Sequence, residues 1–182
     1  MSLALKPAAA VTIRRAAAGD ADTLSALGLA TFRETWLEDH AMPYAAEDLP
    51  PVLEAMYGPR ATEALLADPA CAFWLAEEDG AAVGYALAGP CTLPYPDVTP
   101  ACGELKRLYL LRRARGGRTG ERLLLEALGW LERQGRRRIW LGVWSGNLAA
   151  QRFYARHGFE MVGEHVFPVG RVQDREFAMR RG

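Results

Sequence analysis

The residues best suited to chemistry form a basic, glycine-rich turn, Arg115-Gly-Gly-Arg-Thr-Gly120, between a predicted strand (104–111) and a predicted helix (119–134). Such a turn leaves backbone N–H groups free at a helix N-terminus, where the helix dipole favours a phosphate. The glycine spacing differs from that of a nucleoside triphosphate loop and from that of a dinucleotide fingerprint. The turn therefore predicts another kind of anionic ligand. An ordinary connection with solvated arginines is the alternative.

A second candidate group follows downstream. The apolar run 139–143 predicts a buried strand, and Asn147 can cap a helix over 148–157 that ends at a glycine. Tyr154 lies on this helix. A tyrosine with a pKa of about 10 stays protonated at neutral pH and can donate a proton as a general acid. The alternative is that Tyr154 packs beside Phe153 in the core.

The order of these motifs is similar to that of a known family. Asn-x-x-Ala-x-x-Phe-Tyr-x-x-x-Gly-Phe over 147–159, placed after the basic turn and one further strand, resembles the Gcn5-related N-acetyltransferase (GNAT) superfamily, whose members bind acetyl-CoA. The resemblance covers nearly the whole chain. Four segments are most similar to the bacterial spermine/spermidine acetyltransferase branch: 32–36, 104–109, 139–144 and 167–179. The implied fold is α/β, with a mixed, mostly antiparallel central sheet flanked by helices and two central strands splayed at the cofactor cleft.

The resemblance also implies residues that hold acetyl-CoA. The backbone of three strand residues would bind pantetheine: Leu108, Tyr109 and Leu110. The turn would bind the pyrophosphate through Arg115, Gly116, Gly117, Arg118, Thr119 and Gly120. Asn147 would make a further contact with CoA. Arg118 stands where the family usually has glycine, which implies altered CoA affinity. We expect the preceding Gly117 to supply the required backbone conformation.

The catalytic roles carried over from the family fall on two residues. Tyr154 is the predicted general acid for the leaving thiolate, and Glu104 is the predicted base for the acceptor ammonium. Alternatively, Glu104 only pairs with a neighbouring basic side chain. Trp36 and Tyr85 are expected to line the acceptor pocket, although aromatic residues at such positions also serve as core.

Composition predicts one domain over 11–182, preceded by a flexible segment over 1–10: the chain has 182 residues and 50% hydrophobic content. No apolar stretch approaches the ~20 residues of a membrane span, and no signal peptide is evident. These features predict a cytoplasmic protein. The three cysteines fit no metal-ligand spacing and the three histidines are scattered, so we expect no metal.

The net charge is zero, which argues against nucleic acid as a partner. The two halves differ, however. Residues 1–102 carry 5 basic and 14 acidic side chains, a net charge of −9, and residues 103–182 carry 17 and 8, a net charge of +9. The acidic half, which includes Glu34, Glu38, Asp39, Glu47 and Asp48, would suit a cationic acceptor. Alternatively, the two halves neutralise each other.

The remaining pattern predicts a strand at 11–15, a helix from about 20 to 38, short helices at most in the proline-rich 43–69, and a hairpin of 71–77 and 82–88 that turns at Asp79-Gly80. The predicted function is acetyl-CoA-dependent transfer of an acetyl group to a small primary amine, with a polyamine as the leading acceptor. Acetylation of a protein, a peptide or an amine antibiotic stays open, as do a non-catalytic CoA-binding module and a homodimer.

Overall fold

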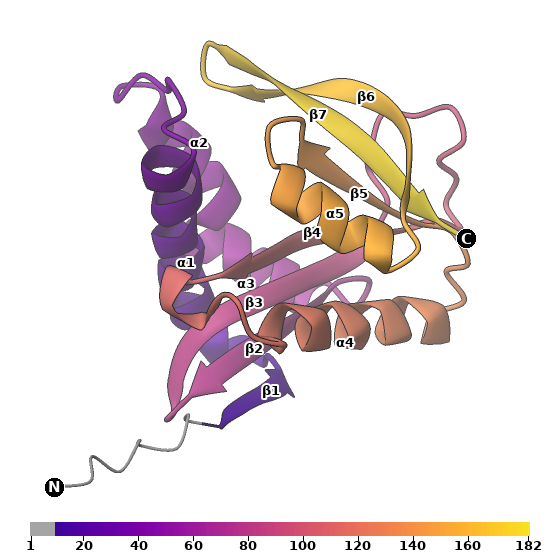
Figure 1. Ribbon diagram of the computed structural model, residues 1–182. Coiled ribbons are helices and arrows are strands. Elements are labelled where there is room, and N and C mark those ends of the chain that lie inside the picture. Colours follow the sequence, from indigo (N-terminus) through magenta and orange to yellow (C-terminus); the bar gives the residue numbers. More distant parts are fainter. Residues whose placement is uncertain (1–9) are drawn as a thin grey trace, which may run out of the picture.

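The computed structural model describes residues 10–182, so the predicted flexible segment 1–10 lies, except for Ala10, outside the described residues. A seven-stranded sheet forms the centre, in the order β1-β2-β3-β4-β5-β7-β6 (Figure 1). Its strands are β1 (Val11–Arg15), β2 (Ala72–Glu78), β3 (Ala81–Pro90), β4 (Gly103–Leu110), β5 (Ile139–Trp144), β6 (Glu160–Val169) and β7 (Val172–Arg181). All neighbours pair antiparallel except β4 and β5, which are parallel. The mixed, mostly antiparallel α/β fold is confirmed.

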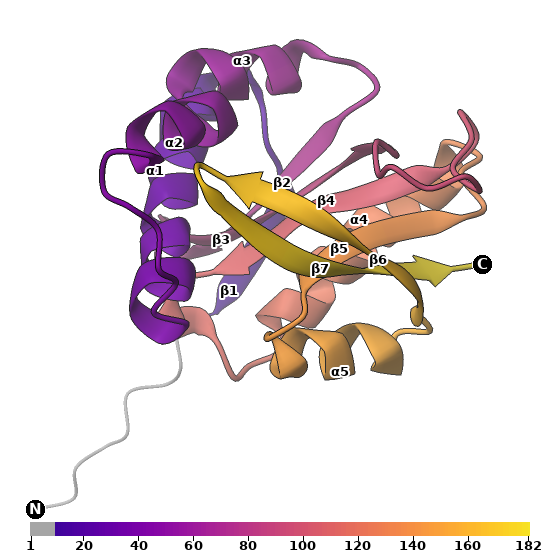
Figure 2. The ribbon, with the colours of Figure 1, turned by 90° about the horizontal axis from the view of Figure 1, so that it is seen from above.

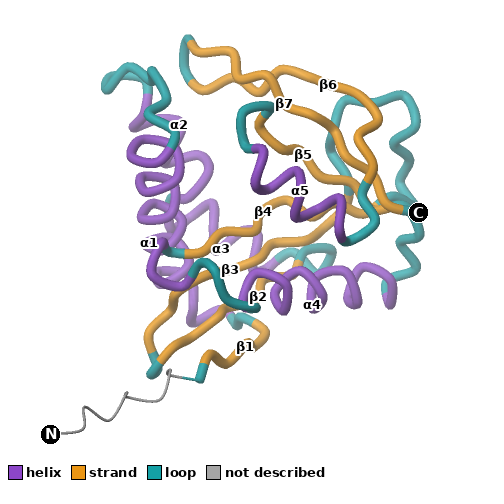
Figure 3. Tube along the Cα trace, viewed as in Figure 1, coloured by secondary structure: helices purple, strands orange, loops and turns teal. Residues whose placement is uncertain are grey.

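The helices lie outside this sheet, as the purple tubes around the orange strands show in Figure 3. They are α1 (Ala21–Phe32), continued by the π-helical η2 (Arg33–Asp39), α2 (Leu49–Tyr57), α3 (Pro59–Ala67), α4 (Thr119–Arg133) and α5 (Leu148–Arg156), with short 3-10 turns η1 (Ala18–Asp20) and η3 (Arg112–Ala114). In the proline-rich segment, prolines occupy the first turns of α2 and α3. A proline costs no hydrogen bond there, because the first N–H groups of a helix lack an intrahelical acceptor.

Consecutive residues of the central strands β2 and β3 are buried, and their side chains point alternately to the two faces of the sheet, so helices cover both faces (Figure 2). Phe73 and Leu75 of β2 point to the cluster that contains α1 residues, whereas Trp74 and Ala76 point to the cluster formed with α4 and α5. On α4, the buried residues recur at helical spacing: Leu123, Leu124, Ala127, Leu128 and Leu131. Each fully buried leucine stabilises the fold by about 1.5–3 kcal/mol. This packing fixes the N-terminus of α4 against the sheet.

The splay between β4 and β5 is the feature that creates the site. The two strands pair only at Gly103 with Ile139 and at Glu104 with Trp140. On its other side β4 pairs with β3 through a bulge, where Arg107 and Leu105 have successive partners and Lys106 is the extra residue. A bulge bends its strand and increases its twist, so β4 turns away from β5 beyond this point. The predicted splayed strands are confirmed.

The β2–β3 hairpin turns at Asp79 and Gly80, as expected, with φ of 50° and 78°. Positive φ at both positions matches the right-handed twist of the flanking strands. Within residues 10–182, no helix combines the length and the apolar character required to cross a bilayer.

Candidate active site

Two cavities meet at the splay. The first, of about 620 Å³, lies between the diverging halves of β4 and β5 and reaches the turn before α4 and the helix α5. The second, of about 420 Å³, is lined by α1, α2, β4, β6 and β7. Both volumes fall in the range of small-molecule sites. Six residues line both cavities and define what we call the junction: Trp36, Lys106, Arg107, Tyr109, Gly142 and Glu176.

The glycine-rich turn forms one end of the first cavity. Gly116 has a φ of +83°, whereas Gly117 is not among the residues with positive φ, and Arg118 occupies the N-cap of α4 with a φ of −88°. The expectation that Gly117 supplies the special conformation is therefore wrong, because the chain reverses one residue earlier. Within the described chain, the N–H groups of 116–121 have no hydrogen-bond acceptor. Together with the helix dipole, these donors could bind an anion.

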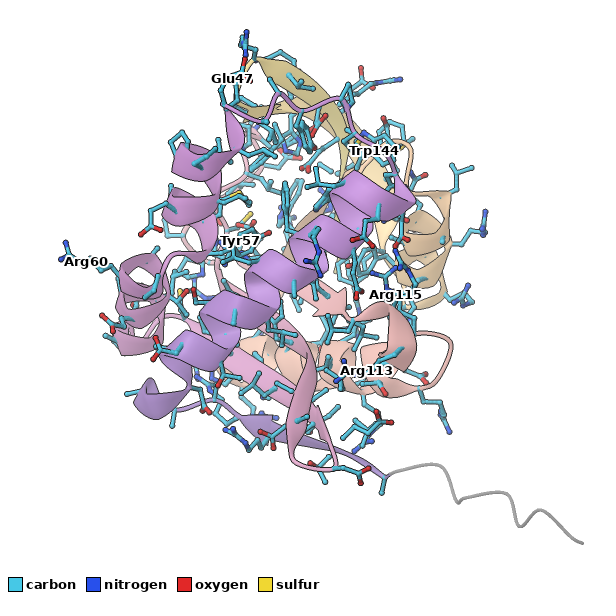
Figure 4. All side chains as sticks on the ribbon, turned by 90° about the vertical axis from the view of Figure 1, so that its left-hand side faces the viewer. Glu47, Tyr57, Arg60, Arg113, Arg115 and Trp144 are labelled. Carbon is cyan, nitrogen blue, oxygen red and sulfur yellow. The ribbon has the colours of Figure 1, made fainter. Side chains whose placement is uncertain are left out.

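The two arginines of the turn are placed differently. The Arg115 guanidinium donates to the carbonyl oxygen of Leu110 over 3.0 Å, to the Asp39 carboxylate and to the Thr35 hydroxyl, while still lining the first cavity. The side chain of Arg118 is 86% exposed and pairs with Glu121. Arg118 therefore stays available to an anion at the turn, whereas Arg115 also fastens the turn to η2. Figure 4 shows Arg115 and Trp144 near the η2 end of the long helix.

Tyr154 lines the first cavity from α5. Asn147 caps this helix, with its Oδ1 accepting from the Ala150 N–H at 3.0 Å, and also lines the cavity. The Tyr154 ring lies 5.3 Å from the Phe153 ring and 5.9 Å from the Phe159 ring, so it both packs in the core and reaches the cavity. Burial raises the pKa of Tyr154 above its usual value, so the hydroxyl keeps its proton.

Glu104 lines the second cavity only. Its Oε2 accepts from the Lys106 ammonium at 2.8 Å, from the Thr92 N–H at 2.8 Å and from the Thr92 hydroxyl at 3.0 Å. The pairing foreseen as the alternative for Glu104 is therefore present.

The two aromatic residues expected in the acceptor pocket lie in different places. Trp36 reaches the junction, where its ring lies edge-on to that of Trp144 with centroids 6.0 Å apart. Tyr85, by contrast, lines neither cavity: only 1% of it is exposed, and it packs with Phe73 and Leu87 in the core. The reason is that β3 lies inside the sheet and its Tyr85 face is covered by α1.

Sequence reasoning missed an acidic pair on β7, Asp174 and Glu176. The Tyr44 hydroxyl donates to Asp174, and the His165 Nε2 lies 3.3 Å from the Glu176 Oε2. Burial, with the nearby charges of Asp174 and Glu104, raises the pKa of Glu176 to about 7. Burial also lowers the pKa of His165. No motif surrounds these residues. The one available signal was the acidic residues in a strand that had to pack beside the cleft.

The comparisons with known proteins agree with this geometry. The family model of the Acetyltransferase (GNAT) family matches residues 29–159. This protein belongs to that family. An uncharacterized N-acetyltransferase of Mycobacterium tuberculosis is 33% identical over 164 residues, which cover 89% of this chain and 97% of the relative. A second, from Lactobacillus delbrueckii, is 28% identical over 157 residues, which cover 84% and 88%.

Solved structures share the fold of this GNAT protein. The PaiA N-acetyltransferase of Thermoplasma acidophilum, solved in complex with coenzyme A, superposes with a TM-score of 0.73 at 20% identity, covering 94% of this chain and 98% of that chain. A ribosomal-protein-alanine N-acetyltransferase of Brucella melitensis superposes with a TM-score of 0.68 at 25% identity, covering 93% and 98%. The assignment to the spermine/spermidine branch has no counterpart in these matches.

As a GNAT protein, this chain is an acyltransferase, an acetyl-CoA-dependent N-acetyltransferase. The first cavity fits that donor, because its turn offers free N–H groups to a pyrophosphate and its splayed strands offer unpaired backbone to an extended pantetheine. Residues 10–182 contain no group of three or more His, Cys, Asp or Glu side chains that could hold a metal ion.

The acidic residues of the first half of the chain have roles other than the one suggested by the charge count. Glu38 and Asp39 pair with Arg112, Asp39 also pairs with Arg115, and Glu47 and Asp48 pair with Arg171. None of these acidic side chains lines the second cavity. The alternative in which the two halves neutralise each other is therefore the better description. The carboxylates of the second cavity, Glu104, Asp174 and Glu176, come from the basic half of the chain.

Proposed function

We propose that the protein acetylates a primary amine of a small polycation, with a polyamine as the acceptor, and that this acceptor binds in the second cavity. One observation carries the proposal: three carboxylates, Glu104, Asp174 and Glu176, line a cavity that shares the six junction residues with the donor cavity. An ammonium group in a partly buried cavity is stabilised by charge-assisted hydrogen bonds to carboxylates.

The second cavity has more carboxylates than Lys and Arg side chains, three against two. Lys106 is paired with Glu104 at 2.8 Å, and the Arg107 guanidinium lies over the Tyr57 ring, 4.7 Å from its centroid. Asp174 and Glu176 have no Lys or Arg partner in the described chain. Aromatic side chains form part of the walls and suit the methylene segments and the charge of an alkylamine: Phe32, Trp36, Tyr44, Tyr57, Tyr109 and Phe167.

For the donor, we propose the residues carried over from the family. The backbone of Leu108, Tyr109 and Leu110 would bind pantetheine, with one N–H polarising the acetyl carbonyl, and the turn from Arg115 to Gly120 would bind the pyrophosphate. Tyr154 would protonate the leaving thiolate, and Asn147 would contact CoA as well as cap α5.

A second candidate is the amino terminus of a protein or peptide. Lys106 and Arg107 at the junction favour it, because they could bind the carbonyl or carboxylate groups that a peptide carries and a polyamine lacks. The Brucella protein named as a ribosomal-protein-alanine N-acetyltransferase adds weight to this candidate. An amine antibiotic and a CoA-binding module without turnover are the remaining alternatives.

An acceptor panel tests the proposal. Free CoA thiol is measured after incubation with acetyl-CoA and spermidine, spermine, a neutral-tailed monoamine, amino acids, an alanyl peptide or an aminoglycoside. We expect the polyamines to give the highest kcat/KM. Asp174→Asn should raise the KM for spermidine by roughly tenfold, which corresponds to about 1.4 kcal/mol, with the KM for acetyl-CoA unchanged.

Glu164→Gln is the matched control, because Glu164 lies on the exposed part of β6, pairs with Arg175 and lines neither cavity. It should leave both KM values unchanged. If turnover is confined to peptides, the polyamine proposal is wrong and the acceptor is the amino terminus of a protein or peptide. Binding of acetyl-CoA without turnover of any amine would favour the non-catalytic module.

A further inference from the structure

We propose that Glu176, rather than Glu104, accepts the proton from the acceptor ammonium, and that Glu104 acts as a positioning residue through its pair with Lys106. The inference rests on the proposed function, since it assumes that the amine in the second cavity meets the donor in the first.

Position distinguishes the two glutamates. A base must touch the ammonium at the point where that nitrogen approaches the acetyl carbon, which is where the two cavities join. Of the described residues that line both cavities, Glu176 alone carries a carboxylate, while Glu104 lines the second cavity only. Three hydrogen bonds also occupy the Oε2 of Glu104.

The neighbouring strand makes room for the Glu176 carboxylate. A Cβ built on Gly142 of β5 would lie 2.6 Å from the Glu176 Oε2, so any larger residue at 142 would displace the carboxylate from the junction. On the β6 side, the His165 Nε2 lies 3.3 Å from the same oxygen. One oxygen of Glu176 therefore lies between β5 and β6, beside an imidazole that could orient it.

The surroundings of Glu176 suit proton transfer near neutral pH. The titratable and charged groups around it are His165 from β6, Asp174 from its own strand, Tyr44 from the segment before α2, and Glu104, Lys106, Arg107 and Tyr109 from β4. Burial is the largest cause that raises the pKa of Glu176 to about 7, followed by Asp174 and Glu104. A base is most effective when its pKa lies near the working pH.

The proton balance is complete. Glu176 removes one proton from R–NH₃⁺ and passes it to solvent, and the free amine forms a C–N bond with the acetyl carbon. The C–S bond then breaks, and Tyr154 donates its proton to the departing sulfur. The remaining excess proton on nitrogen restores the Tyr154 hydroxyl, directly or through water, so that one proton is released for each amide formed.

The pH dependence of kcat/KM for spermidine tests the assignment, with Glu176→Gln, Glu104→Gln and Glu164→Gln compared with wild type. For wild type we expect kcat/KM to rise through an apparent pKa of about 7. Glu176→Gln should lower kcat/KM by about 10²–10⁴-fold at pH 7. It should also abolish this rise, which is the ascending limb of the pH profile, so that the remaining rate follows the fraction of neutral amine. Glu104→Gln should lower the rate but keep the limb, and Glu164→Gln should match wild type.

A weakly basic acceptor provides the second readout. 2,2,2-Trifluoroethylamine is largely neutral at pH 7 and needs no base to lose the first proton, so the deficit of Glu176→Gln should shrink with it by at least tenfold. Unchanged acetyl-CoA affinity and an intact thermal transition would show that the variant is folded.

Loss of the limb in Glu104→Gln but not in Glu176→Gln would overturn the assignment and make Glu104 the base. An equal deficit of Glu176→Gln with both amines would also overturn it, because Glu176 would then act in binding. If wild type acetylates no amine at all, the proposed function fails first, and the base assignment fails with it.

Discussion

At the scale of single residues, Tyr154 both packs in the core and lines the first cavity. Its ring is held between Phe153 and Phe159, while the residue lines the cavity proposed for the CoA sulfur. Tyr154→Phe keeps the ring and removes only the hydroxyl. Stability should therefore change little, acetyl-CoA affinity should survive, and kcat should fall by ~10²–10⁴-fold, the usual range for a lost general acid. Steady-state kinetics and calorimetry measure these quantities; wild-type turnover would make Tyr154 a packing residue.

Glu176 couples the site to the pH dependence of stability. Burial raises the pKa of its carboxyl from the usual value of 4.5 to about 7 in the folded protein. The folded state therefore binds more protons than the unfolded state between these values, and the contribution of Glu176 to stability falls as pH rises through this window. Glutamine mimics the protonated form. The free energy of unfolding of Glu176→Gln minus that of wild type should therefore grow by about 3 kcal/mol from pH 4.5 to pH 7.

Urea denaturation across this range measures that difference, with Glu164→Gln as the control, since Glu164 is exposed and its one ion-pair partner among residues 10–182 is Arg175. The control difference should stay nearly constant. A flat difference for Glu176→Gln as well would mean that its carboxylate is solvated in the folded protein and that burial does not set its proton affinity.

The residues that could be predicted from sequence are those embedded in motifs. Asn147 and Tyr154 share a pattern with the family, and the structure places both at the first cavity. Asp174 and Glu176 belong to no pattern, because burial and distant neighbours, rather than local sequence, make them unusual. Tyr85 was misplaced for the same reason, since its alternation on β3 fits either a pocket wall or a core and only the position of α1 decides between them.

At the scale of elements, the turn between β4 and α4 depends on one glycine. Gly116 has a φ of +83°, whereas Gly117 does not have a positive φ, and neither glycine has a neighbour within 4 Å of a built Cβ. An added Cβ would thus have equal room at the two glycines, which differ only in backbone conformation. Gly116→Ala should lower the free energy of unfolding by about 1–2 kcal/mol, while Gly117→Ala should change it by less than ~0.5 kcal/mol. Chemical denaturation of both variants checks this, and equal effects would contradict the turn geometry.

The splay of β4 from β5 is an element-scale feature that spacing alone could not locate. The family resemblance predicted it, but the local cause is the bulge at Lys106, which requires the pairing register with β3 to be known. The contact of η2 with the turn, through Asp39 and Arg115, joins segments 76 residues apart. Local rules cannot detect a contact of that range. The bounds of β1 to β5 could be predicted closely from sequence, because alternation and turn residues act locally.

At the scale of the whole molecule, the acidic first half and the basic second half fold onto each other. Arg112 and Arg115 bind the acidic end of η2, and Arg171 binds Glu47 and Asp48. The charge separation along the sequence therefore does not persist as two charged surfaces of the ligand site. What remains is a smaller arrangement, with free N–H groups at one end of the joined cavities and carboxylates at the other. An anionic donor would thus suit the first cavity and a cationic acceptor the second.

The most direct test of this account is to identify the product by mass spectrometry after incubating the protein with acetyl-CoA and spermidine, and to quantify free CoA thiol in the same sample. The account predicts mono-acetylated spermidine in an amount equal to the thiol released, with both lost together in Tyr154→Phe and Glu176→Gln. Thiol released without acetylated amine, or equal product from the two variants and wild type, would contradict it.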